Sequence, residues 1–432
     1  MVADRIMRNL VTVSFVIALT TGCAFGQQPQ VSPWLTEAER TKFESLRIVG
    51  SEALFNLDYE TARKNFKEMA VAFPNYPAGP QFLADTLWAE TLYQTRRLQS
   101  SLYGSDDTFY STSDDKADPR VVDQFRTLTR QARLLAEARL KTNPHDPEAL
   151  YFLGATEGLK ASFEEAVERR HFAALRDGNN AVDHHREVLK LEPNFVDAEL
   201  TVGLYEYVVG SLPLPIKIIA GITGFRGSKK RGLSLIEHVA KEGKWSRDDA
   251  KTLLIVLYTR EERFADALTL ARDLSAKYPR NYLFRLEAAD ALVAQAAVER
   301  KARNAVAAAR SEREAFATFD DLLRDRSVRE TVSRALDLVH FKYGEVLLMA
   351  GQADRAAKEF LAATTIERAE ASLVTMAHLY AARAFDLAGK RDDALTQYRE
   401  VLTRPDIYAA HDEAKKGLRQ PYKGESARNT GT

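Results

Sequence analysis

Small and apolar positions recur along the chain at two alternating spacings, 12 and 22 residues. Two helices that cross closely need a small side chain at the crossing, so this pattern predicts a series of helix pairs, each with a first helix A and a second helix B. The 12-residue step joins Gly50 to Ala62, Ile255 to Ala267, Gly344 to Ala356 and Ala382 to Ala394, and the 22-residue step joins Ala62 to Ala84, Ala132 to Gly154, Ala181 to Gly203 and Ala267 to Ala289.

Turn residues support the same arrangement. Pro74, Pro144, Pro193 and Pro279 each lie twelve residues after an alanine of the pattern, where helix B should end. Proline has no backbone N–H and cannot continue a helix, so these positions separate one pair from the next. Allowing for insertions where the spacing is longer, the pattern predicts eight helix pairs between about residues 36 and 403.

The stretch from residue 46 to 74 resembles the tetratricopeptide repeat (TPR), a unit of 34 residues with a small residue at position 8, alanine at 20, an aromatic residue at 24 and proline at 32. Gly50, Ala62, Phe66 and Pro74 occupy these positions. The resemblance extends over nearly the whole mature chain and implies an all-α, right-handed superhelical solenoid over residues 36–420, with a disordered tail at 421–432. The proposed helix-crossing residues are Gly50, Ala62, Gly154, Ala181, Gly203, Gly232, Ala267, Gly344, Ala356 and Ala394.

In TPR proteins, positions 2, 5, 9, 12 and 13 of helix A line a concave groove, so the resemblance implies a groove that binds a partner peptide or helix. The alternative is that insertions of the chain itself fill this groove, because a large exposed apolar surface is a liability on a monomer. The predicted lining is apolar and aromatic and consists of Leu54, Phe55, Trp88, Tyr151, Leu200, Leu204, Tyr207, Thr252, Val256, Phe341, Leu348, Met349 and Leu379.

Two insertions have simple interpretations. Residues 104–119 are rich in Asp, Ser and Thr but lack the central glycine and final glutamate of a calcium loop, so a surface loop is expected. Between Gly154 and Ala181 there are fifteen extra residues. This length is close to four helical turns, which predicts a lengthened helix A followed by a turn at Asp177-Gly178.

A third insertion, residues 210–231, contains an apolar stretch with Pro213 and Pro215, followed by basic residues up to Arg231. We expect residues 212–225 to pack against the solenoid and partly fill its groove, since each buried large apolar side chain contributes about 1.5–3 kcal/mol. The alternative is a peripheral membrane protein, in which the insertion at 212–231 docks on anionic lipid headgroups.

The N-terminus has the pattern of an export signal. Arg5 and Arg8 precede an uncharged apolar run at residues 10–19, which is too short to span a bilayer. Cleavage of a signal peptide at residues 1–26 would leave a linker at 27–35. Alternatively, the segment ending in Cys23 resembles a bacterial lipobox, with Thr20 where leucine is usual, and Cys23 would be acylated. Either cleavage predicts the bacterial cell envelope, as periplasmic or membrane-anchored protein; an uncleaved cytoplasmic chain is the remaining alternative.

The composition argues against several classes of function. With 61 Lys and Arg against 61 Asp and Glu, the chain has no basic excess and is not expected to bind nucleic acid. Its single cysteine excludes a disulfide framework and Cys-based metal or redox sites. No metal site or other cofactor is predicted.

One histidine, His171, has the spacing from a glutamate that is found in di-iron sites. The spacing of Glu168 and His171 places both on one helix face, as in di-iron bundles, but such a site needs a second motif, for which only Asp337 and His340 offer a partial match. His185 falls at helix-B position 24, which predicts a structural role; His184 is its neighbour.

These observations predict a non-enzymatic protein-interaction scaffold of the cell envelope. The alternatives are the peripheral membrane protein and, less favoured, an enzyme with a histidine-based site. The stretch from Gly210 to Arg280 also resembles segments of exported bacterial TPR proteins of unassigned role.

Overall fold

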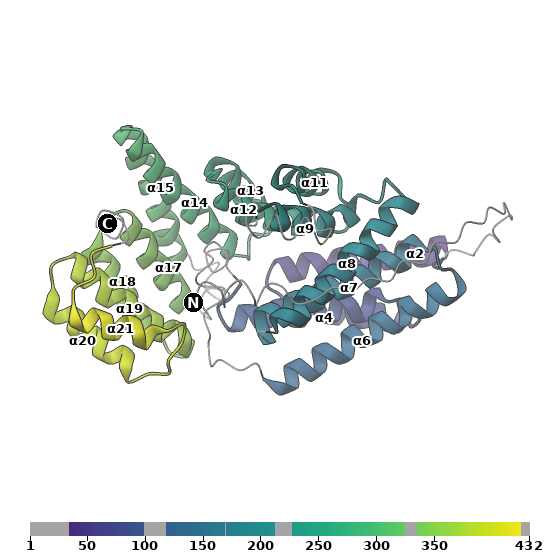
Figure 1. Ribbon diagram of the computed structural model, residues 1–432, viewed down its shortest axis with the longest axis horizontal. Helices are drawn as coiled ribbons and strands as arrows, with labels where there is room; N and C mark the ends of the chain where they lie inside the picture. Colours follow the sequence, from purple (N-terminus) through teal and green to yellow (C-terminus); the bar gives the residue numbers. More distant parts are fainter. Residues whose placement is uncertain (1–33, 99–117, 169, 212–226, 325–334, 425–432) are drawn as a thin grey trace, which may run out of the picture.

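The computed structural model of the chain (Figure 1) describes residues 34–98, 118–168, 170–211, 227–324 and 335–424. Within these ranges the protein consists of 17 α-helices and contains no strand. The N-terminal 33 residues, including Cys23, lie outside the described residues, as do most of the loop predicted at 104–119 and the apolar stretch 212–225. None of the described helices is both long enough and apolar enough to cross a membrane.

The described helices form eight consecutive antiparallel pairs, so the predicted all-α superhelical repeat fold is confirmed (Figure 1). A final short helix, α21 (Ala410–Arg419), covers the last pair. The pairs are α2 (Glu37–Phe55) with α3 (Tyr59–Ala72), α4 (Ala78–Gln94) with α6 (Pro119–Thr142), α7 (Pro147–Phe163) with α8 (His171–Leu191), α9 (Glu199–Ser211) with α11 (Lys229–Glu242), α12 (Arg247–Arg260) with α13 (Phe264–Lys277), α14 (Leu283–Lys301) with α15 (Ala305–Arg324), α17 (Leu336–Met349) with α18 (Ala353–Thr364), and α19 (Ala371–Leu387) with α20 (Arg391–Leu402).

Four helices end just before a proline, and α2 begins at a capping residue. The second helices α3, α6, α8 and α13 each stop two residues before Pro74, Pro144, Pro193 and Pro279, respectively, because the residue before a proline disfavours the helical conformation. At the start of α2, the Thr36 hydroxyl accepts the Glu39 backbone N–H while the Glu39 carboxylate accepts the Thr36 backbone N–H.

In the first, third and seventh pairs, a glycine of helix A packs against a ring of helix B. A Cβ on Gly50 would overlap the Phe66 ring, and one on Gly344 would overlap the Phe360 ring. In the third pair the ring is that of His185, which a Cβ on Gly154 would approach to 2.5 Å. The helix-B alanines proposed as crossing residues are all fully buried: Ala62, Ala181, Ala267, Ala356 and Ala394.

In the fourth pair both crossing residues are glycines. A Cβ on Gly232 would lie 2.6 Å from the Gly203 carbonyl oxygen, and a Cβ on Gly203 would lie 2.8 Å from the Ile236 side chain. Glycine on both helices therefore lets the backbones of α9 and α11 approach more closely than any larger residue would allow.

One sequence prediction about the third pair is wrong. Asp177 and Gly178 do not form a turn but lie inside α8. The chain reverses earlier, after a π-helical segment, η2 (Glu164–Glu168), and the extra residues lengthen both helices of the pair. Ion pairs hold Asp177 within the helix, with Lys160 on α7 at 2.6 Å and with its neighbour Arg176 at 2.9 Å.

Candidate binding surface

The residues predicted to line a groove fall into two sets. Nine keep some exposure: Leu54, Phe55, Trp88, Leu200, Thr252, Val256 and Leu348 are half-buried, and Leu204 and Met349 are exposed. The other four, Tyr151, Tyr207, Phe341 and Leu379, are between 1% and 7% exposed and so offer little surface to a partner.

Contacts within the protein account for this burial. Phe341 packs edge-on against Phe360 and against Tyr380 of the following pair, at centroid distances of 5.4 Å. Tyr207 donates its hydroxyl to Glu261 at 2.6 Å. Leu379 belongs to the core beneath α21. The inner side of the solenoid is thus partly occupied by its own side chains.

Trp245 shows how tightly the solenoid curves. Its ring lies 6.1 Å from Phe43 of the first pair and 5.3 Å from Tyr151 of the third, and its indole N–H donates to Glu44 at 3.0 Å. The Asp197 carboxylate accepts three consecutive backbone N–H groups of residues 244–246, at 3.2, 2.8 and 2.7 Å, which fixes the turn that carries Trp245. The first pair therefore contacts the connection between the fourth and fifth pairs.

The first two helix pairs also contact residues that lie later in the chain than Trp245. Asn281 donates its side-chain amide to the Phe55 carbonyl at 2.7 Å, and the Phe55 ring stacks on Tyr278 at 4.9 Å. Beyond this contact, Arg96, just after α4, forms a buried ion pair with Asp337 at the start of α17. These contacts close the N-terminal pairs onto the fifth, sixth and seventh pairs.

Other helices carry two kinds of side chain on the inner side: exposed apolar ones on α9 and buried ionisable ones on α14 and α17. On α9, Leu204 and Val208 lie one turn apart on the face turned away from α11 and are 38% and 51% exposed. On α14 and α17, Lys342 is almost fully buried and pairs with Asp290 at 2.7 Å and Glu345 at 2.8 Å. Burial, only partly offset by the charge of Lys342, raises the pKa of Asp290.

Two further inner carboxylates have no such cation. Asp85 on α4 and Asp249 on α12 form no hydrogen bond or ion pair with any described side chain. Desolvation raises the pKa of Asp85 to about 6. The Asp249 side chain is exposed, and the surrounding protein together with the negative charges of Asp85, Asp248 and Asp197 raises its pKa. These two carboxylates were not among the residues predicted to line the groove.

His185 packs in the protein interior. His185 is 2% exposed, stacks on Tyr151 at 5.1 Å and donates Nε2–H to the Tyr151 carbonyl at 3.0 Å. Desolvation lowers its pKa to about 4, so it is neutral at physiological pH. The side chain of His171 lies outside the described residues, and Asp337 and His340 bond to different partners, Arg96 and Glu359.

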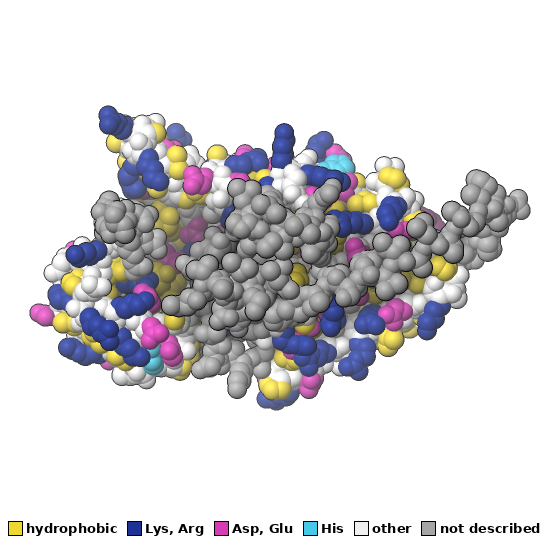
Figure 2. Space-filling model, in the orientation of Figure 1, with side chains coloured by type: hydrophobic (Ala, Val, Ile, Leu, Met, Phe, Trp, Pro, Cys, Tyr) yellow, Lys and Arg dark blue, Asp and Glu magenta, His cyan; other side chains and the backbone are white. Residues whose placement is uncertain are grey.

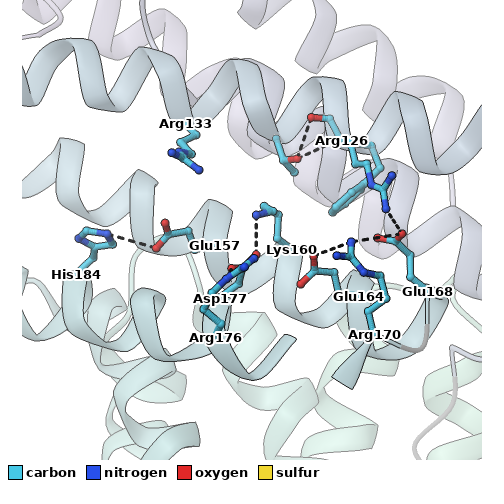
Figure 3. Close-up of polar contacts among 12 residues, drawn as sticks. Arg126, Arg133, Glu157, Lys160, Glu164, Glu168, Arg170, Arg176, Asp177 and His184 are labelled. Atoms are coloured by element: carbon cyan, nitrogen blue, oxygen red, sulfur yellow. Dashed lines mark hydrogen bonds and ion pairs between the residues drawn. The ribbon is translucent and has the colours of Figure 1, made fainter. Parts of the chain in front are cut away.

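A polar cluster lies between α7, α8 and η2 (Figure 3). Its carboxylates are mostly paired: Asp177 with Lys160, Glu164 with Arg170 at 3.5 Å, and Glu168 with Arg126. Glu157 is the exception: among the described side chains it forms an ion pair with His184 alone, at 3.3 Å.

Desolvation, followed by the negative charge of Asp177, raises the pKa of Glu157 to about 7. Desolvation also lowers the pKa of His184. Among the described residues, no three His, Cys, Asp or Glu side chains are placed to hold a metal ion. The ion pair between Lys160 and Asp177 joins α7 to α8.

No family model matches the chain, and no curated protein matches its sequence. Among solved structures it is similar to the human IFIT1 dimer with m7Gppp-AAAA, at a TM-score of 0.45 and 15% identity, covering 88% of this chain and 85% of that one. It is also similar to yeast Tom70 (0.36, 12%, 87% and 88%) and to a tetratricopeptide repeat protein from Parabacteroides merdae (0.32, 11%, 79% and 99%). At these values the likeness says nothing about ligand or partner, and the fold rests on the helix pairs themselves.

Proposed function

We propose that this protein is a non-enzymatic interaction scaffold of the bacterial cell envelope that binds a peptide or helix of a partner protein on the inner side of its solenoid. The observation that carries the proposal is the pair Leu204 and Val208 on α9, which remain exposed at groove positions although neighbouring positions are covered. Half-buried Leu200 on the same helix and Val256 on α12 extend this apolar surface. An amphipathic segment recognises such a surface with side chains one turn apart.

Mixed surface charge is compatible with a protein partner. On the face drawn in Figure 2, the described Lys and Arg side chains are interspersed with Asp and Glu and with hydrophobic side chains. Such a surface produces no large field of one sign, so recognition would depend on local shape and on individual charges.

The placement in the envelope rests on the N-terminal sequence, with its basic start, short apolar run and small residues before Gly26. The alternative of membrane attachment through residues 212–231 or acylated Cys23 also rests on sequence. Of its basic residues, Lys229 is engaged within the protein, since its ammonium pairs with Glu261 at 2.5 Å and lies 5.6 Å from the Tyr207 ring.

A comparison of captured proteins tests this function. Tagged parent protein and the double variant Leu204→Asp/Val208→Asp are used to capture proteins from envelope extracts, with Val306→Asp as control because Val306 is 83% exposed on α15. We expect one protein to be captured by the parent and the control but lost from the double variant. Equal capture by all three would place the binding surface elsewhere.

A further inference from the structure

The sixth helix pair is longer than its neighbours. Helices α14 and α15 contain 19 and 20 residues, whereas α12 and α13 contain 14 each and α17 and α18 contain 14 and 12. At 1.5 Å per residue, the extra length amounts to about 7–8 Å. Figure 1 shows this pair reaching past its neighbours at the upper left.

The projecting end is the turn between the two helices. Every residue from 300 to 306 is exposed, whereas Leu283, at the opposite end of α14, is buried. Val306, in the first turn of α15, is 83% exposed, and Val298, in the last turn of α14, is 43% exposed. The protein therefore leaves two aliphatic side chains in water at the end of its longest pair of neighbouring helices.

The same end carries more positive than negative charge. Residues 298–313 contain two acidic side chains, Glu299 and Glu312, against five basic ones, Arg300, Lys301, Arg303, Arg310 and Arg313. Both acidic groups are engaged within the pair, since Glu312 pairs with Arg300 and the Glu299 carboxylate accepts the Ser311 hydroxyl at 3.0 Å. Neither of these carboxylates pairs with the other four cations.

Three of the cations are unpaired. The exposed side chains of Lys301, Arg303 and Arg310 form no ion pair with any described side chain. Figure 2 shows dark blue side chains at this projecting end, at the upper left. Unpaired cations around an exposed valine suit a partner that has negative charge at its surface and an apolar layer beneath it.

We propose that the end of the α14–α15 pair docks on a bilayer that contains anionic lipid, with Lys301, Arg303 and Arg310 at the lipid phosphates and Val306 in the headgroup layer. This inference goes beyond the proposed function, because it concerns a different surface and a different kind of partner. It requires neither residues 212–231 nor acylated Cys23. Its affinity comes from charge attraction to the lipid and from burial of the apolar side chain.

An anionic bilayer fits this end better than a nucleic acid does. Both offer phosphates, but proteins that bind single strands also stack bases on aromatic side chains, and residues 298–310 contain none. Phosphate contacts along a duplex use basic and polar side chains and give Val306 no role. A bilayer, in contrast, provides an apolar layer for this side chain.

Sedimentation with vesicles tests the inference. The full chain carries Cys23→Ser, so that no acyl group can hold it on the vesicles. We expect this parent to bind vesicles of phosphatidylcholine mixed with phosphatidylglycerol, but not vesicles of phosphatidylcholine alone. The triple variant Lys301→Ala/Arg303→Ala/Arg310→Ala should bind the mixed vesicles about 100-fold more weakly, because each cation near an anionic surface contributes about fivefold.

A neutral change tests the apolar contact separately. Val306→Ser keeps every charge and should weaken binding about tenfold, since the buried valine surface is lost. The matched controls, which change exposed residues on α3 and α6, are Val71→Ser and the triple variant Lys67→Ala/Arg130→Ala/Lys141→Ala. Both controls should bind like the parent, and thermal melting should be the same for all these proteins because only exposed side chains change.

Three results would overturn the inference. The first is no binding of the parent to the mixed vesicles, or equal weakening by the Lys301 and Lys67 triple variants. The second is binding that is lost in Lys230→Ala/Arg231→Ala but kept in the Lys301 triple variant, which would assign the membrane contact to residues 212–231. The third is duplex DNA that binds the parent more tightly than the vesicles do and binds Val306→Ser equally well, which would indicate a nucleic-acid surface.

The inference and the proposed function can fail separately. Val306→Asp should lose vesicle binding yet capture the same protein as the parent, whereas Leu204→Asp/Val208→Asp should keep vesicle binding and lose the captured protein. A failure to bind vesicles therefore leaves the capture result, and with it the scaffold function, unaffected.

Discussion

The guanidinium of Arg96 lies against the carboxylate of Asp337, with Nε 3.1 and 3.2 Å from its two oxygens, and joins two residues that are 241 positions apart in the chain. Both side chains are buried, at 8% and 1% exposure. Asp337 also accepts the backbone N–H of Glu370 at 2.9 Å. This pair therefore connects the second helix pair to the seventh and helps to close the solenoid.

Arg96→Met should destabilise the protein by about 3–5 kcal/mol, because it leaves a buried carboxylate without its cation. The double variant Arg96→Met/Asp337→Asn should recover part of the loss, since its amide oxygen can still accept the Glu370 N–H. Urea unfolding measures both changes, with Arg313→Met on the exposed side of α15 as control. A parent-like midpoint for Arg96→Met would mean that the second and seventh pairs are not joined in solution.

The same glycine-to-alanine change should have opposite effects at two positions. Gly203→Ala places a Cβ 2.8 Å from Ile236 and should cost about 1–3 kcal/mol, and Gly203→Leu should cost more. Gly178→Ala meets only the Ala161 Cβ at 3.8 Å, inside α8, and should stabilise the helix by up to about 1 kcal/mol. Thermal melting decides the outcome. Equal effects would show that α9 and α11 do not cross at Gly203.

Glu157 should make stability depend on pH. Its pKa in the folded protein, about 7, is above the ordinary value of 4.5, so the folded state resists ionisation that the unfolded chain accepts. The resulting cost is absent below about pH 4, grows as the pH rises towards 7 and is complete above that value. Glu157→Gln should therefore exceed the parent in stability by about 1–3 kcal/mol at pH 8 and match it near pH 4.

Urea unfolding over this pH range measures the difference, with exposed Asp123→Asn as control. A difference between Glu157→Gln and the parent that stays constant from pH 4 to 8 would show that Glu157 is not held in a desolvated site.

Metabolic labelling with a fatty-acid analogue distinguishes the two forms of the N-terminus. Under simple cleavage, the mature chain begins at Gln27 and carries no label. Under acylation, the label is present in the parent and lost in Cys23→Ser. Detection of the full-length chain, starting at Met1, in the cytoplasm would contradict both and with them the envelope location.

The sequence predicted the helix pairs because a close crossing leaves no choice of residue at a few positions. Gly50, Gly154 and Gly344 face rings that leave no room for a side chain, so their spacing is visible without a structure. The position of the turn in the third pair was not predictable in this way. Asp177-Gly178 has the composition of a turn, but the ion pairs of Asp177 with Lys160 and Arg176 favour helix there.

The inner surface was predicted least well. Its burial depends on how far the solenoid curves, which is the sum of small rotations between neighbouring pairs and has no local sequence signal. Phe55 meets Tyr278, and Trp245 meets Phe43, only because the first pair returns to the fifth. On α4 the prediction included Trp88 but not Gln81 or Asp85, which lie seven and three residues before it on the same helix.

Site-specific crosslinking in cells tests the scaffold function most directly. A photoreactive amino acid is placed at Leu204, and in separate control proteins at Val71 and Val306, which are 81% and 83% exposed on α3 and α15. A partner bound on the inner side predicts one discrete crosslinked product with a second protein from Leu204 that is absent from both controls and reduced by Val208→Asp. No product from Leu204, or the same products from all three positions, would contradict binding at this surface.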